Sequence, residues 1–579
     1  MRLGPMSRAP SWGAWEISRP AETVGNGLGL VMALLHGVAR FDWAEASAQI
    51  QRYDDMVFSD EQVGTARERV AVRPDLDRSV AMIVFALLAV AALLPVLLTP
   101  IPPMVDYPNH LARMYILSRN GTPDANPYYE VAWAFYPNLA MDLLIPQIAR
   151  LISVENATRL FLLLSQVLIV GGAVALERVV KGRVHLAGFA ALMLLYCLPF
   201  TWGFVNFEFG LGVALWGVAA YLMFAERAWP LRFVVHTVFV AALFTAHFFA
   251  LGVYGATLGF YELWRASDRK ASYREIISRL VLLAIPAAAL FGIMQITAGS
   301  IGAEGTIWSI EFKPIWLFRI MNGYNLLVSV MTALMLMASL FVAAKRGVLK
   351  LAPAGIWISI GFALLYLAIP SRLLGTSFAD LRVIPAVGLI VPAFCSLSLP
   401  GRRWNLAALA VVSVITLANL AVVYAVWLPY RADYAAIIAS FHKIDRGSKV
   451  LIGSSGAGED PPFNDLALYP MFYAPTLAVH YANAFVPSLF TAVGKQPVQA
   501  RAAFQRLAIP EGGPVSIRLL AAIAAGLKSS EIPPFIRTWT QDYDYLYLLA
   551  PQGANPLPER LEELDRSARF VLYKIRRAP

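Results

Sequence analysis

Long apolar runs alternate with short polar segments along most of the chain, from about residue 79 to residue 428. A helix needs about 20 apolar residues to cross the ~30 Å hydrocarbon core of a bilayer, and windows of this length recur here. The pattern predicts a polytopic α-helical membrane protein with about eleven transmembrane helices. The predicted spans are residues 79–100, 158–177, 184–203, 208–225, 231–246, 249–264, 279–298, 324–344, 352–370, 384–400 and 404–428.

The basic residues between these runs predict the orientation of the chain. Lys and Arg are enriched in cytoplasmic loops. If residues 1–78 form a cytoplasmic extension, the basic loops all fall on the cytoplasmic side, and eleven crossings fit this alternation. The long loop 101–157 and everything after Trp427 are then extracytoplasmic. The basic loops are residues 178–183, 227–232, 265–279, 345–350 and 402–403.

The last part of the chain, residues 429–579, has a different pattern. Apolar runs that start near Lys449, Tyr543 and Phe570 are typical of strands. Because strands alternate with helices, we expect a soluble α/β domain with a partly parallel sheet, after a transmembrane domain of residues 79–428. The predicted helices of this domain are residues 431–443, 497–507, 515–527 and 556–567.

Composition supports a membrane protein and excludes other classes. The chain is 58% hydrophobic and only 15% charged, which is too apolar for a soluble surface. The net charge of +10 comes from clusters between spans rather than from a basic face, so we predict no nucleic-acid partner. Cys197 and Cys395 both lie in apolar runs, which argues against a cysteine metal cluster and against a disulfide.

The first polar cluster of interest follows the first span, in Val-Asp106-Tyr-Pro-Asn109-His110. Pro102, Pro103 and Pro108 constrain this backbone at the membrane surface. A carboxylate held there can act as a general base. His110 is a further candidate catalytic residue close to it, and Asn109 is a candidate substrate-binding residue. The alternative is that Asp106 only caps the helix that follows.

A second cluster lies in the short turn between the third and fourth spans, where Asn206 and Glu208 stand among aromatic residues and glycines. A carboxylate beside the membrane needs a partner, so Glu208 is a second candidate catalytic residue and Asn206 a substrate-binding one. The alternative is an interfacial anchor. His247, between two short spans, is either a structural histidine or a further substrate-binding residue.

Arginines near the tenth span are candidates for binding phosphate. The planar fork of Arg372 or Arg382 could hold a lipid-linked phosphate at this surface. The alternative is an Asp380–Arg382 ion pair or contact with ordinary lipid headgroups. Lys313 is a weaker phosphate candidate, in the amphipathic loop 304–320.

With these residues in place, the layout of residues 79–579 resembles the GT-C superfamily of integral membrane glycosyltransferases, which use polyprenyl-phosphate sugars as donors. The shared features are a long first extracytoplasmic loop that opens with an acidic residue (Asp106), a histidine at a pair of short helices (His247), an arginine at the entry to a late span (Arg382) and a soluble C-terminal domain.

The resemblance implies that Asp106 deprotonates an acceptor hydroxyl, while Arg382 or Arg372 stabilises the departing lipid phosphate. The donor would be a polyprenyl-phosphate-linked sugar and the acceptor a glycan, a lipid or a protein. The resemblance firmly implies no cofactor and leaves a divalent metal as the alternative. The first loop has no Asp-Asp or Glu-Asp pair, which argues against a subtype that depends on such a metal.

Two other functions fit a polytopic chain. A transporter or lipid flippase should carry ionisable residues deep within its spans, yet the polar groups here gather at one surface. A non-catalytic assembly protein would merely hold its C-terminal domain against a partner. The asymmetry favours chemistry at the membrane surface, in a protein integral to the inner membrane with its C-terminal domain outside the cytoplasm.

Overall fold

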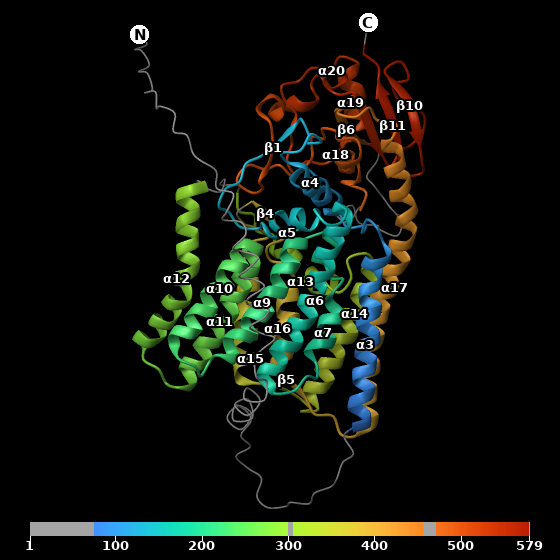
Figure 1. Cartoon of the computed structure of the whole chain (residues 1–579). Helices are drawn as coiled ribbons and strands as arrows, with labels where there is room; N and C mark the ends of the chain where they lie inside the picture. Colours follow the sequence, from blue (N-terminus) through green and yellow to red (C-terminus); the bar gives the residue numbers. More distant parts are fainter. Residues whose placement is uncertain (1–74, 299–304, 374, 456–469, 578–579) are drawn as a thin grey trace, which may run out of the picture. The chain divides into compact units, whose positions relative to one another are not determined.

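The computed structural model describes residues 75–298, 305–373, 375–455 and 470–577. The predicted extension, residues 1–78, lies almost entirely outside the described residues. Seven described helices are long and apolar enough to cross a membrane, and the chain is an integral membrane protein (Figure 1). These helices are α3 (Asp75–Leu98), α6 (Val154–Lys181), α9 (Val205–Met223), α10 (Trp229–Ala246), α12 (Tyr273–Ala298), α14 (Leu326–Lys345) and α17 (Arg402–Phe441).

Other described helices occupy the remaining predicted spans. The window 184–203 is divided, because the helix ends before Cys197 and a new one starts with Pro199 in its first turn, where the missing N–H of proline is tolerated. The window 384–400 is helical only in its first part and ends as a strand. The count of eleven crossings stays a prediction. These elements are α7 (Ala187–Leu194), α8 (Leu198–Trp202), α11 (Phe248–Asp268), α15 (Pro353–Ala368), α16 (Val383–Ile390), η2 (Val391–Phe394) and β5 (Cys395–Leu397), which pairs with β2 (Leu349–Leu351).

Pro95 interrupts the hydrogen bonding inside α3, and side chains from elsewhere bond the carbonyls before it. Proline has no N–H to donate to the carbonyl four residues earlier, which is that of Ala91. The Tyr424 hydroxyl of α17 donates to the Ala91 carbonyl at 3.1 Å, and the Tyr196 hydroxyl donates to the Ala92 carbonyl at 2.6 Å. Unpaired backbone groups are costly in a bilayer, so these bonds tie α3 into the bundle.

Buried ion pairs join helices at the end of α9 that is opposite Glu208. Glu262 of α11 accepts from Arg232 of α10 at 2.8 Å and from Arg279 of α12 at 3.1 Å. It also accepts from the Tyr221 hydroxyl of α9 at 3.0 Å. The Glu262 carboxylate therefore links four helices in the region that the basic loops predict to be cytoplasmic.

The C-terminal domain is built on a five-stranded sheet with strand order β10-β11-β9-β6-β8. β6 lies parallel to β8 and β9, whereas β11 lies antiparallel to β9 and β10. The predicted partly parallel sheet is confirmed. The three predicted strands are found as β6 (Val450–Ser454), β9 (Tyr545–Leu549) and β11 (Phe570–Ile575).

The predicted helices of this domain are only partly right. Residues 556–567 are wrong as a helix, because they contain the edge strand β10 (Leu561–Arg566), which pairs with β11. Residues 431–443 continue α17, which is one 40-residue helix from the membrane into the domain. The other elements here are β7 (Val498–Ala500), η5 (Ala502–Leu507), β8 (Val515–Ser516), α19 (Ile517–Ala524), η4 (Ala474–Leu477), α18 (Ala478–Tyr481), η6 (Pro534–Ile536) and α20 (Trp539–Asp542).

The first loop is bonded to the C-terminal domain. It contains α4 (Tyr107–Arg119), β1 (Tyr129–Val131) and α5 (Ala140–Ile148), and β1 pairs antiparallel with β7. The Tyr129 hydroxyl donates to the Val486 carbonyl at 2.9 Å and accepts from its N–H at 3.0 Å. The domain thus packs onto the loop that opens with Asp106.

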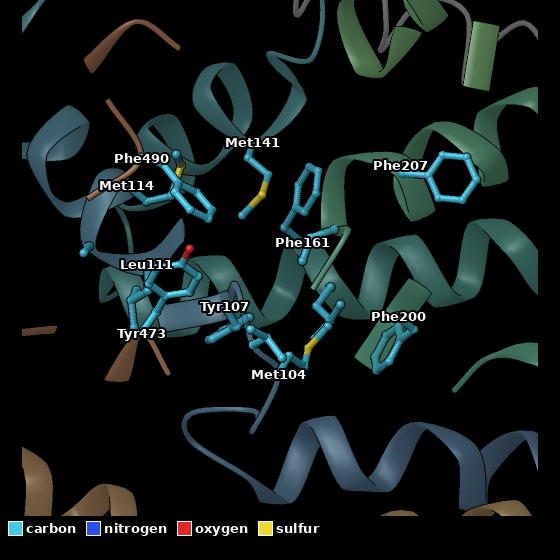
Figure 2. Close-up of a cluster of buried hydrophobic side chains, with 14 of the residues drawn as sticks. Met104, Tyr107, Leu111, Met114, Met141, Phe161, Phe200, Phe207, Tyr473 and Phe490 are labelled. Atoms are coloured by element: carbon cyan, nitrogen blue, oxygen red, sulfur yellow. The ribbon is translucent and has the colours of Figure 1, made fainter. Parts of the chain in front are cut away.

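An apolar cluster completes this contact. Figure 2 shows Tyr473 and Phe490 of the C-terminal domain beside Tyr107, Leu111 and Met114 of α4. All five side chains are buried. Because both parts of the chain contribute to one core, the position of α4 depends on the domain above it.

Candidate active site

Asp106 lies in the turn between α3 and α4, where backbone contacts fix it. Its N–H donates to the Trp202 carbonyl at 2.9 Å. Gly203 packs directly against it: a Cβ there would lie 3.0 Å from both the nitrogen and the Cβ of Asp106, and its φ of +96° suits only glycine. The Asp106 side chain makes no capping bond to α4. The alternative interpretation of Asp106 as a helix cap is therefore wrong.

The surroundings of Asp106 change its acidity. The pKa of this carboxyl is raised from 3.8 to about 8, chiefly by burial and then by the negative charge of Glu511, while the positive charge of Arg382 opposes both. A group with a pKa near the working pH is well suited to take up a proton during a reaction. This acidity suits the predicted role of Asp106 as a general base, and the role itself stays a prediction.

Arg382 is buried among aromatic rings and backbone carbonyls. Its Nη1 donates to the carbonyls of Ser377 at 2.6 Å and Phe378 at 3.0 Å. The centre of the guanidinium lies 4.2 Å from the ring of Phe204 and 5.1 Å from that of Phe249, distances typical of cation–π contacts. These contacts hold the charged group in place without neutralising it.

No carboxylate among the described residues lies within ion-pair distance of Arg382. Its Nε is buried without a hydrogen-bond partner. Burial lowers its pKa to about 9, and the negative charges of Asp106, Glu208 and Asp380 act in the opposite direction, so it is a cation at neutral pH. A buried cation with an unused N–H group is suited to bind an anion such as a phosphate.

Asp380 pairs with Lys313 and not with Arg382. The Lys313 ammonium lies 3.4 Å from Asp380 Oδ2 and donates to the carbonyls of Tyr366 at 2.6 Å and Ile369 at 2.8 Å. The Asp380–Arg382 pair considered from the sequence is therefore wrong. Because the ammonium is already committed to three partners, the structure gives no support to Lys313 as a phosphate ligand.

The segment that carries Lys313 has its polar and apolar sides reversed. Lys313 begins α13 (Lys313–Arg319) and is buried, whereas Ile310, Phe312 and Ile315 are exposed. Ile310 and Phe312 belong to η1 (Ile310–Phe312). Apolar side chains that point outward suit contact with lipid at the membrane surface.

Arg372 lies in the short hairpin that Arg382 also contacts. It belongs to β3 (Arg372–Leu373), which pairs with β4 (Thr376–Ser377), and its backbone exchanges two hydrogen bonds with Ile307 at 3.1 and 3.2 Å. Since Arg382 donates to the Ser377 carbonyl, both arginines belong to one local structure. A role for Arg372 in binding phosphate stays a prediction.

Glu208 is buried at the start of α9 and has few partners. Its Oε1 lies 3.8 Å from the Cys197 thiol, and its charge acts on Arg382. His247 is the N-cap residue of α11, where its Nδ1 accepts from the Phe249 N–H at 3.1 Å. Its ring also contacts that of Phe207 with centroids 5.5 Å apart. These contacts support a structural role for His247, and a substrate-binding role stays a prediction.

The two predicted asparagines bind backbone rather than facing an open site. Asn109 donates to the Ser488 carbonyl at 2.9 Å and accepts from the Phe490 N–H at 2.7 Å. Asn206 donates to the Asn138 carbonyl at 2.8 Å and accepts from the Met141 N–H at 3.0 Å. Both amides hold the first loop in place, so the geometry supports positioning and not direct substrate binding.

His110 faces the C-terminal domain from the first turn of α4. Burial and the positive charge of Arg113 lower the pKa of its ring to about 3, so the imidazole is neutral at neutral pH. Its ring contacts Phe490 edge to face, with centroids 5.5 Å apart, and its Nδ1 is buried without a partner. A catalytic role for His110 stays a prediction.

Three residues of the C-terminal domain join this region without a signal in the sequence. The charges of Asp106 and Glu511 both act on the Tyr473 hydroxyl, and its pKa is raised, chiefly by burial. Lys495 Nζ lies 3.4 Å from both carboxylate oxygens of Glu511. These residues are more than 360 positions from Asp106, and only the docking of the domain onto the first loop brings them near it.

The described residues place a carboxyl of raised pKa and a buried cation at the end of the helical membrane domain where the C-terminal domain packs onto the first loop. No family model and no curated protein matches the sequence.

Two solved structures resemble the chain, and both are of ArnT from Cupriavidus metallidurans, a GT-C glycosyltransferase. One is in the apo state, with a TM-score of 0.48, and the other is bound to undecaprenyl phosphate, with a TM-score of 0.46. Each is 13% identical in sequence to this protein, and each match covers 86% of this chain and 97% of the ArnT chain.

Proposed function

We propose that the protein is a glycosyltransferase that moves a sugar from a polyprenyl-phosphate donor to a hydroxyl group of an extracytoplasmic acceptor. The observation that carries the proposal is that Asp106 packs against Gly203, while the Arg382 guanidinium lies 4.2 Å from the ring of the next residue, Phe204. The charge of each also acts on the pKa of the other. A base and a phosphate-binding cation are the two groups that this reaction requires.

The reaction is a single displacement at the anomeric carbon of the sugar. Asp106 takes the proton of the acceptor hydroxyl, and the acceptor oxygen forms a bond to the anomeric carbon. The bond between this carbon and the phosphate oxygen breaks, and its electron pair leaves with the lipid phosphate. Arg382 stabilises the negative charge that develops there.

The surroundings of the site suit a lipid-linked donor. The rings around Arg382 hold the guanidinium in a fixed position and exclude water from it. A cation that is already in place needs no reorganisation when negative charge develops on the phosphate. The outward-facing apolar residues of η1 and α13 provide a surface for lipid next to the same hairpin, because Ile307 is bonded to Arg372. The acceptor, whether a glycan, a lipid or a protein, would approach from the side of the C-terminal domain.

Consumption of a defined donor tests the proposal. The full-length protein in nanodiscs would be given a panel of undecaprenyl-phosphate hexoses and pentoses, with a membrane extract as the source of acceptors, and free undecaprenyl phosphate would be measured by mass spectrometry. We expect at least one donor to be consumed and Asp106→Asn to abolish its consumption at normal membrane yield. A panel that is left intact, or an Asp106→Asn variant as active as the wild type, would overturn the proposal.

A further inference from the structure

We infer that Glu511 is a positioning residue for the proposed base, Asp106. The C-terminal domain holds Glu511 through Lys495 against the β3–β4 hairpin and bonds its carbonyl to Tyr473, which packs beside the start of α4. The inference rests on the proposed function, in which Asp106 is the general base. It gives the C-terminal domain a part in the chemistry in addition to covering the site.

The loop that carries Glu511 is tightly built. Its sequence from residue 509 is Ile-Pro-Glu-Gly-Gly-Pro, and Glu511 has a φ of +64°, which a residue with a side chain rarely adopts. A Cβ on Gly512 would lie 2.5 Å from the Ile509 side chain, and one on Gly513 would lie 2.6 Å from the Phe472 ring. The packing therefore requires both glycines and fixes the backbone that holds Glu511.

Side-chain contacts connect Glu511 to both parts of the chain. Lys495 Nζ lies 3.4 Å from each of its carboxylate oxygens and donates to the Gly375 carbonyl at 3.2 Å, in the β3–β4 hairpin. The Tyr473 hydroxyl donates to the Glu511 carbonyl at 3.3 Å. The hairpin that binds Lys495 also binds Arg382, so Glu511 and Arg382 are attached to the same structure.

Two charges of opposite sign act on Asp106: Glu511 from the C-terminal domain and Arg382 from the entry to α16. The Tyr473 hydroxyl, from the segment before η4, is neutral because its pKa is raised. Lys495 faces Glu511 and partly offsets its charge. Because like charges favour the protonated form, loss of the Glu511 charge should make Asp106 more acidic, and loss of the Lys495 charge should make it less acidic.

Infrared titration of the full-length protein in detergent measures this directly and needs no substrate. The carboxylic-acid band of Asp106 is the band that Asp106→Asn removes. We expect its midpoint to fall by on the order of one pH unit in Glu511→Gln and to rise in Lys495→Met. The matched control is Glu562→Gln, an exposed glutamate on β10 that is paired with Arg576, and it should leave the midpoint unchanged.

Opposite shifts distinguish a charge effect from a loosened structure. A Glu511→Gln midpoint equal to that of the wild type, or shifts of the same sign in both variants, would overturn the inference. It would also fall if Asp106→Asn removed no titrating band. The proposed function fails separately, through donors that are not consumed, so the two results can be told apart.

Discussion

Replacing Arg382 should weaken the binding of a lipid phosphate more than replacing any exposed arginine. The guanidinium has five N–H groups, and the two bonds to Ser377 and Phe378 both come from Nη1. The groups on Nε and Nη2 remain for a ligand. A charge-assisted hydrogen bond contributes about 1.5–3 kcal/mol, so loss of two such bonds should reduce affinity by roughly 100-fold or more.

The neighbouring carboxyl groups increase the expected effect. In Arg382→Gln, the phosphate would meet the carboxyl groups of Glu208 and Asp106 without the cation that faces them in the wild type. Arg382→Lys keeps the positive charge but loses the planar fork, so we expect a smaller loss of about 10-fold. The comparison of the two variants separates charge from geometry.

Native mass spectrometry of the detergent-solubilised protein with undecaprenyl phosphate is a suitable assay. Phosphatidylglycerol would serve as the competing anionic lipid, and Arg566→Gln, an exposed arginine paired with Glu563, as the control variant. Equal binding of undecaprenyl phosphate by wild-type protein and by a folded Arg382→Gln variant would refute the assignment of Arg382. Equal competition by phosphatidylglycerol would show a general headgroup site instead.

Three further predictions follow from the charges. Transfer should increase with pH and reach half of its maximum near pH 8, because Asp106 must lose its proton to act as a base; a pH–rate profile that is flat from pH 6 to pH 9 would contradict this. Asp142→Asn leaves Arg113 buried without its partner at 3.0 Å and should lower the free energy of unfolding by about 3–5 kcal/mol, measured as a loss of thermal stability, whereas Glu563→Gln should cost less than about 1 kcal/mol. Reporter fusions should give a cytoplasmic signal at Gly182 and an extracytoplasmic signal after Pro579; a cytoplasmic signal at the C-terminus would reverse the predicted topology.

The membrane domain could be predicted well, because a bilayer demands long apolar helices and the sequence displays them directly. Departures arise where local chemistry intervenes, as at Pro199, which starts a new helix inside a predicted span. Residues 561–566, Leu-Glu-Glu-Leu-Asp-Arg, suggest a helix by composition. They form an edge strand because they pair with β11. Helix propensity, which depends on the local sequence alone, does not predict this tertiary contact.

The candidate site could be predicted only in part. Charged residues next to a membrane are costly, which makes Asp106 and Arg382 candidates from the sequence, and their roles stay predictions. Asn109 and Asn206 carry the same signal, yet their amides bond to backbone groups that only the folded loop supplies. Glu511 lies far along the chain in a loop with no motif, so its electrostatic effect on Asp106 follows from domain docking alone.

An experimental structure of the full-length protein with undecaprenyl phosphate tests the central claim most directly. We expect the phosphate oxygens to accept hydrogen bonds from the Arg382 guanidinium, with the prenyl chain against the membrane helices and Asp106 beside the space left for the sugar. A phosphate bound away from Arg382, with the guanidinium contacting only protein carbonyls and aromatic rings, would contradict the proposed mechanism.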